Sequence, residues 1–217
     1  MPRQVTTRET LIEAARVLFW KQGYEATSTA QILEAAGAGS GSLYHFFSSK
    51  EELLLAVLEW YKANLEKMVV EPVFKRIKEP IERIFGILEA YRMQLRQTKF
   101  EHGCPVGSLA LELSNSHPGA RKLIAENFKA WCAVIEKCLQ EIKHRLPRSV
   151  DRKQLSEFIL TTMEGAVMLA RTYRSVAPYE AAVAQLRHYF DCLLRKPTAR
   201  GLSRGDKPRS PSPKKEK

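Results

Sequence analysis

The chain has 217 residues, of which 44% are hydrophobic and 27% charged, and a formal net charge of +11, a composition that is ordinary for a globular protein of one large or two modest domains. No apolar run approaches the ~20 residues that a membrane-spanning helix needs, and the N-terminus lacks the apolar segment of a secretory signal, so we expect a cytoplasmic protein without membrane contact. Cys104, Cys132, Cys138 and Cys192 show neither CxxC pairing nor matched Cys/His spacing, which argues against a metal site and a disulfide framework, and no cofactor motif is present.

The first predicted helix begins after Thr6. Thr6 and Glu9 have the spacing of a capping box, and Gly23 is placed to end the helix. Between them, apolar residues recur on one broad stripe: Leu11, Ile12, Ala15, Leu18 and Phe19. We expect this helix to support the two that follow.

Residues 27–47 predict two short helices joined by a tight turn. Ser28 and Gln31 form a second capping box, and Gly37 can end the first helix because glycine takes positive φ at no steric cost. Ser40 or Ser42 can begin the second helix, which runs to about Phe47. This arrangement is that of a DNA-reading helix-turn-helix.

The second of these helices is predicted to have one buried and one exposed face. Leu43 and Phe47 lie one turn apart on the same side and should pack inward. Their burial turns a small, polar and partly aromatic surface outward: Gly41, Ser42, Tyr44 and His45. Ser49 then precedes a long helix beginning at Lys50, whose amide groups and side chain are available to a phosphate.

Three sequence blocks carry a resemblance to a known family: Ala35-Ala36-Gly37, Gly41-Ser42-Leu43-Tyr44-His45-Phe46-Phe47 and Ser49-Lys50-Glu51-Glu52-Leu53. In order, spacing and flanking helices, roughly the first 60 residues resemble the DNA-binding domain of the tetracycline-repressor (TetR) family. At the start of the second helix the family commonly has Ser then Lys, whereas this chain has Gly39 then Ser40, which implies a different operator. The resemblance implies DNA contacts at Thr27, Thr29, Gly39, Ser40, Gly41, Ser42, Tyr44, His45 and Lys50, with Ser42 nearest the base edges.

The larger C-terminal part is helical throughout. Its apolar periodicity and proline breaks predict helices over about 50–70, 80–98, 106–115, 118–145, 151–173 and 178–195. The last two carry continuous apolar faces with small residues that allow close approach of a partner, and the resemblance implies a homodimer through these helices. We therefore expect an all-α chain with an N-terminal three-helix DNA-binding domain (1–50), a larger effector-binding and dimerisation domain (51–196) and a disordered basic tail (197–217).

Aromatic, sulfur-containing and polar residues gather in the middle helices. Each can be an ordinary core residue, but together they can line an apolar small-molecule pocket. The resemblance favours an effector pocket, and the candidate lining residues are Tyr91, Phe100, His102, Cys104, Phe128, Trp131, Met163 and Met168.

The sequence thus favours a homodimeric, ligand-responsive transcriptional repressor that binds palindromic operator DNA and is released by a small molecule. One alternative is a redox- or electrophile-sensing regulator, because Cys104 lies at a helix start near His102 and Lys99, surroundings that can lower the pKa of a thiol. A helical enzyme is a further alternative, but no phosphate-cradling loop, HExxH motif or nucleophile elbow supports it. A helical interaction protein stays open because residues 1–55 hold five basic and six acidic groups, so bulk charge does not argue for DNA binding.

Overall fold

The computed structural model describes residues 6–194, and all regular secondary structure within these residues is helical. The predicted tail at 197–217 lies outside the described residues. Three helices form the N-terminal end: α1 (Thr7–Gln22) and the shorter α2 (Thr29–Ala36) and α3 (Ser42–Phe46). A long helix, α4 (Lys50–Leu65), leads away from them and continues through a π-helical turn, η1 (Glu66–Val70), into α5 (Glu71–Arg76).

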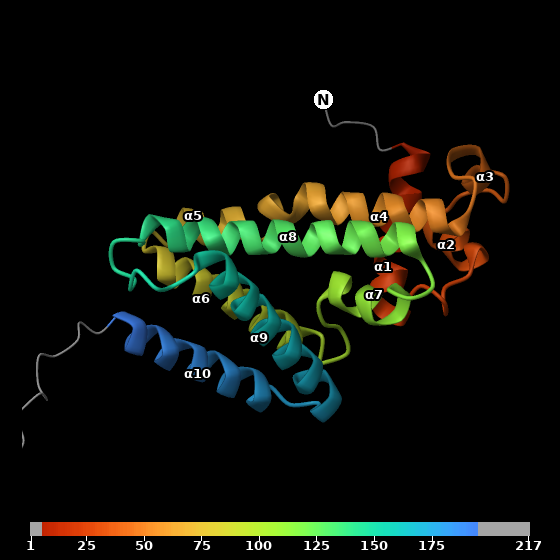
Figure 1. Cartoon of the computed structure of the whole chain (residues 1–217). Coiled ribbons are helices and arrows are strands. Elements are labelled where there is room, and N and C mark those ends of the chain that lie inside the picture. The colour runs from red at the N-terminus through yellow and green to blue at the C-terminus, as the bar shows by residue number, and fades with distance from the viewer. Residues whose placement is uncertain (1–5, 195–217) are drawn as a thin grey trace, which may run out of the picture.

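The remaining helices are α6 (Pro80–Gln97), α7 (Pro105–Leu113), α8 (Pro118–Glu141), α9 (Arg152–Tyr173) and α10 (Ala177–Leu194). Helices α4 and α8 lie side by side along the length of the molecule, with α1, α2 and α3 at one end (Figure 1). Helix α9 packs between α8 and α10, and α6 contacts α8, α9 and α10. The fold class is therefore the one that the sequence predicts, since every described element is helical.

The predicted helix starts are largely confirmed. Thr6 and Ser28 each complete a capping box, and Ser49 accepts a hydrogen bond from the Glu52 amide at the start of α4. Gly37 has φ of 60° and ends α2. Pro80 and Pro118 stand in the first turns of α6 and α8, where a missing N–H leaves no bond unmade.

One predicted break is wrong. The helix predicted over about 50–70 was expected to end before Pro72, the next proline in the sequence, but the chain passes from η1 into α5 with Pro72 in the first turn of α5. A π-helical turn has i to i+5 hydrogen bonds, so its ladder differs from that of the flanking α-helix. Pro72 sits where this change of ladder occurs, and the helical path continues to Arg76.

The described part of the chain has no helix that is both long and apolar enough to cross a membrane. Across residues 6–194, no three His, Cys, Asp or Glu side chains gather as a metal ion would require.

Candidate DNA-reading surface and ligand chamber

The turn between α2 and α3 differs from the prediction in how α3 begins. Neither Ser40 nor Ser42 caps the helix, because Gly41 occupies the N-cap position and no side chain bonds there. The Ser42 amide instead donates to the carbonyl of Gly39 at 2.9 Å. Helix α3 therefore starts without a side-chain cap, and its position depends on packing against α1 and α2.

The faces of α3 are as predicted. Leu43 and Phe47 are 0% and 2% exposed, whereas Tyr44 is 64% exposed. His45 is also exposed, and its ring meets Phe46 edge-on with centroids 4.6 Å apart. An exposed surface therefore runs over Gly39, Ser40, Gly41, Tyr44 and His45, with Ser42 partly exposed.

Thr27 is not available as a DNA contact through its side chain. It is 0% exposed, and its hydroxyl donates to the Gly23 carbonyl at 2.6 Å. Thr27 thus fixes the loop that leads into α2, which corrects the expectation of a phosphate contact by this side chain. Thr29, the first residue of α2, is partly exposed.

Lys50 has a structural role that the sequence did not predict. Its ammonium donates to the carbonyls of Tyr24 and Thr27 at 2.9 and 3.0 Å, and it lies 4.0 Å from the centre of the Tyr24 ring. These contacts tie the start of α4 to the loop between α1 and α2. Two of the three ammonium donors are therefore used inside the protein.

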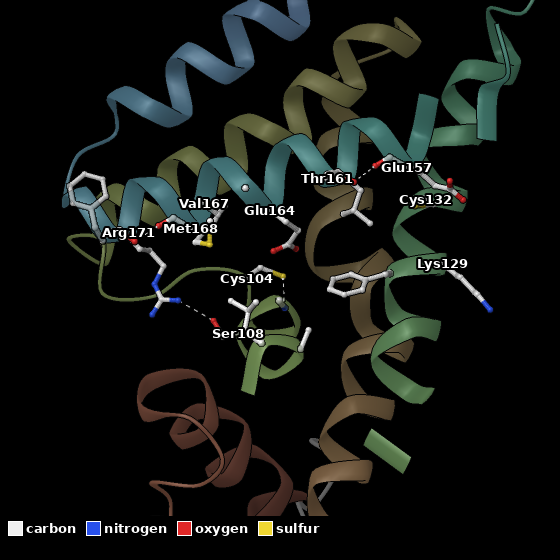
Figure 2. A pocket seen from close by; sticks show the side chains of 18 of the residues that line it. Cys104, Ser108, Lys129, Cys132, Glu157, Thr161, Glu164, Val167, Met168 and Arg171 are labelled. Atoms are coloured by element: carbon white, nitrogen blue, oxygen red, sulfur yellow. Dashed lines mark hydrogen bonds between the residues drawn. The ribbon is translucent and has the colours of Figure 1, made fainter. Parts of the chain in front are cut away.

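A chamber of about 1020 Å³ opens between α7, α8 and α9 (Figure 2). Four of the residues predicted for an effector pocket line it: Phe100, Cys104, Phe128 and Met168. Further apolar side chains in its wall are Leu111, Leu160 and Val167, and charged groups include Glu164 and Arg171. Its volume is at the upper end of the range for small-molecule sites.

The other four predicted lining residues lie elsewhere. Tyr91 and Trp131 line a second cavity of about 460 Å³ that Cys104 also borders. Met163 is buried, in a packing gap of about 10 Å³ with Trp131. His102 lines none of these cavities, and its ring lies 4.8 Å from that of Trp20 in α1. Apolar composition alone therefore did not separate the chamber from the core.

Cys104 is a buried thiol with hydrogen bonds on two sides. Its sulfur accepts from the Gly107 amide at 3.3 Å and from the Tyr91 hydroxyl at 3.9 Å. Burial, and secondly the charge of Glu164, raise the pKa of the Cys104 thiol well above its ordinary value. This corrects the expectation of a lowered pKa, so the thiol chemistry does not favour the redox-sensing alternative.

Glu164 is a charged group of the chamber that the sequence analysis did not include among the candidate pocket residues. Its carboxylate points from α9 toward Cys104 (Figure 2). Its Oε1 is buried and has no hydrogen-bond partner within residues 6–194, and burial raises the pKa of the carboxyl. Between Glu157 and Arg171 it is the sole charged residue, a signal that the sequence did carry.

Helix α7 connects this chamber to the N-terminal helices. The Glu112 carboxylate, near its C-terminus, accepts from the amides of Tyr24 and Glu25 at 3.0 and 2.7 Å. Just before its N-terminus, the Gly103 carbonyl accepts from the Trp20 indole at 2.8 Å. Both ends of α7 are therefore hydrogen-bonded to α1 or to the loop that follows it.

Comparison with known families gives two matches along the chain. Residues 11–57 match the family described as bacterial regulatory proteins, tetR family. Residues 80–185 match the family described as transcriptional regulator LmrA/YxaF-like, C-terminal domain.

Individual relatives agree. The chain is 32% identical over 173 residues to the uncharacterized HTH-type transcriptional regulator YxaF of Bacillus subtilis, covering 79% of this chain and 88% of that protein. It is 31% identical to the HTH-type transcriptional regulator LmrA of Bacillus subtilis, covering 86% and 94% respectively.

Solved structures share the fold. The regulatory protein TetR from Rhodobacter sphaeroides superposes with a TM-score of 0.76 at 23% identity, over 84% of this chain and 98% of that one. Each protein and family named in these comparisons is a transcriptional regulator, which leaves the enzyme alternative without support.

Proposed function

Because the chain belongs to the TetR family of helix-turn-helix transcriptional regulators, we propose that it is a homodimeric repressor that a small molecule releases from palindromic operator DNA. A relative of 25% identity, DhaR of a Mycobacterium species, bears the name of a repressor, which supports repression over activation. The proposed DNA-binding unit is 1–50 and the proposed effector and dimer unit is 51–196. Operator binding implies a cytoplasmic location.

The observation that carries the proposal is the exposed face of α3. Tyr44 and His45 project outward while Leu43 and Phe47 hold the helix in the protein. A helix of this kind enters the major groove and presents short side chains to base edges and phosphates. The proposed contacts are Thr29, Gly39, Ser40, Gly41, Ser42, Tyr44 and His45, with Lys50 adding charge next to the phosphate chain.

The proposed dimer interface is the outer face of α9 and α10. Phe158, Leu169 and Tyr173 on α9 are 49%, 39% and 63% exposed, and Tyr189 on α10 is 41% exposed. The rings of Phe158 and Tyr189 lie 5.7 Å apart, so the apolar face is continuous across the two helices. Exposed small residues on α10, Ala181 and Ala184, allow a partner helix to approach closely.

In the proposed mechanism α7 carries the response. A ligand in the chamber touches Cys104 and Ser108 at one end of α7, and Glu112 at the other end holds the amides of residues 24 and 25. A displacement of α7 would move Glu112 and, through it, the loop between α1 and α2. This would change the separation of the two DNA-binding domains in the dimer. The ligand changes operator affinity only if it binds one separation of the DNA-binding domains more tightly than the other. A difference of about 1.4 kcal/mol in its binding free energy changes operator affinity tenfold.

The test is footprinting of the purified chain on DNA from its own upstream region, with shuffled duplex as competitor. We expect one protected site with two-fold symmetry and a steep loss of affinity with salt. Equal retention of palindromic and shuffled DNA at physiological salt would disprove operator recognition. A compound screen on the protected complex then tests release.

A further inference from the structure

The deep end of the chamber contains an acceptor without a donor. The Glu164 Oε1 is buried and has no hydrogen-bond partner among the described residues, and the neighbouring thiol of Cys104 is a weak donor. A buried carboxylate that lacks a cationic partner is unfavourable, because burial removes the hydration of its charge and nothing in the protein replaces it. The site therefore has the acidic group of an ion pair but lacks the basic group.

The other groups around Glu164 do not supply the missing charge. Cys104 from the start of α7, Tyr91 from α6 and Tyr179 from α10 are neutral, and burial raises the pKa of each of these three groups. Arg171, two turns along α9, donates instead to the Ser108 hydroxyl at 3.1 Å and to the Glu101 carbonyl at 3.2 Å. The remaining charged lining residues of α8 and α9 are Lys129, Glu136, Lys153 and Glu157.

The backbone makes room for this carboxylate. A Cβ on Gly107 would overlap the Glu164 Oε2, so glycine at this position lets the carboxylate lie against the first turn of α7. The wall beyond it is apolar, formed by Phe100, Phe128, Leu160, Val167 and Met168. The chamber thus combines one buried acid with a large apolar volume, a combination that an amphipathic ligand can match.

From this geometry we infer that the effector is a largely apolar molecule carrying one ammonium group, which pairs with Glu164 while its body fills the chamber between α7, α8 and α9. The inference rests on the proposed function, since it names the ligand class of the same chamber. The ammonium supplies both the charge and the hydrogen-bond donors that the carboxylate lacks. Because the ion pair also lies against Cys104 and Gly107, the ligand reaches the end of α7 that leads to the N-terminal helices.

The test uses the full chain and three fluorescent probes with one apolar body: 1-pyrenemethylamine, 1-pyrenemethanol and 1-pyrenecarboxylate. At pH 7 we expect the amine to bind at least about tenfold more tightly than the alcohol, and the carboxylate to bind most weakly. Glu164→Gln should remove the advantage of the amine and leave alcohol binding within about twofold. Glu59→Gln, which neutralises an exposed carboxylate of α4 that does not line the chamber, is the control and should leave amine binding unchanged.

A second variant and a pH series guard against misfolding effects. Gly107→Ala should displace the carboxylate without altering charge, so the ratio of amine to alcohol affinity should fall. Amine binding should weaken as the pH falls through the pKa of Glu164, because protonation removes its charge, while alcohol binding should stay flat. Equal binding of amine and alcohol, binding of no probe, alcohol binding that tightens at low pH, or an unaffected Glu164→Gln variant would each overturn the inference.

Operator release, measured in parallel, separates this inference from the proposed function. Glu164-dependent amine binding that leaves the operator complex intact would refute the coupling and support the ligand class. Release by other compounds without any preference for the amine would support the repressor and refute the ligand class.

Discussion

Tyr44 exposes most of its ring although it stands next to the fully buried Leu43. A ring on the outer face of a short helix leaves apolar surface exposed to water, and contact with a DNA backbone would bury that surface. Tyr44→Ala should therefore weaken operator binding by about tenfold or more, while an exposed substitution changes unfolding free energy by only about 0.5 kcal/mol. Quantitative footprinting and thermal unfolding measure the two effects, and an unchanged footprint would remove Tyr44 from the interface.

Substitution of Lys50 should affect stability as well as DNA binding, because its ammonium donates to backbone carbonyls of the protein. Lys50→Met should destabilise the chain by about 1–3 kcal/mol, since it leaves the Thr27 carbonyl without its Lys50 donor and removes one of the two donors to the Tyr24 carbonyl, the other being the Thr27 amide. Urea unfolding measures this. If Lys50 also holds a phosphate, the salt slope of operator binding should fall by about one. A normal unfolding midpoint in the variant would contradict the structural role.

Cys104 should be unreactive in the folded protein. Only the thiolate reacts with iodoacetamide, and burial together with Glu164 raises the pKa of this thiol, so its thiolate is scarce at neutral pH. We expect Cys104 to be labelled at least about a hundredfold more slowly in the native chain than in urea, as measured by peptide mass spectrometry. Cys104→Ser should leave any oxidant response unchanged. Rapid native labelling of Cys104 would revive a redox role.

At the scale of elements, local patterns predicted most of the fold. Capping boxes at Thr6 and Ser28 and the positive φ of Gly37 depend on residues within a few positions of one another, so the sequence exposes them directly. The start of α3 was predicted less well, because Ser40 and Ser42 match the preferred N-cap type but tertiary packing places Gly41 there. The path through Pro72 was missed because it depends on a π-helical turn, which has no strong sequence signal.

The candidate site was harder to predict because its contacts join distant positions. Glu112 and Tyr24 are 88 residues apart, and Trp20 and Gly103 are 83 apart. The hydrophobic periodicity within one segment does not predict contacts with another segment so far away in the sequence. The same holds for Lys50, whose type and position suggested a phosphate ligand while its actual bonds run to the loop before α2.

Glu112 joins helix α7 to the loop between α1 and α2. Glu112→Gln keeps the size of the side chain but gives up its charge, and an amide has one oxygen acceptor in place of the two that hold Tyr24 and Glu25. We expect faster hydrogen exchange in residues 23–25 and a chamber that still binds its ligand but releases the operator poorly. Ligand titration and operator release measure the two functions separately. Glu59→Gln, on the exposed side of α4, is the control, and normal release in Glu112→Gln would exclude this route.

At the scale of the whole molecule, the three proposed functions of DNA binding, ligand binding and dimerisation fall in different regions. Helices α1, α2 and α3 lie at one end of the α4–α8 pair, and α10 lies away from them on the far side of α9 (Figure 1). The chamber is lined by α7, α8 and α9, and the exposed apolar residues Phe158, Leu169, Tyr173 and Tyr189 belong to α9 and α10. On α9, the chamber residues Glu164 and Arg171 and the exposed residues Phe158 and Leu169 lie on different sides of one helix. Ligand binding and subunit association can therefore be altered separately.

This separation allows a direct test of the proposed dimer. Leu169→Glu places a charge within the apolar face shared by Phe158 and Tyr189, and burial of an unpaired charge opposes association. We expect the dissociation constant of the dimer to rise by at least about tenfold and operator affinity to fall with it, because a monomer holds a single half-site. Sedimentation velocity over a concentration series measures the first effect. Leu111→Glu, which charges the 79% exposed leucine at the mouth of the chamber, is the matched control and should leave the dimer intact. If both variants sediment as the parent chain does, the subunits must associate through another surface. That surface would then determine the spacing of the two DNA-binding domains.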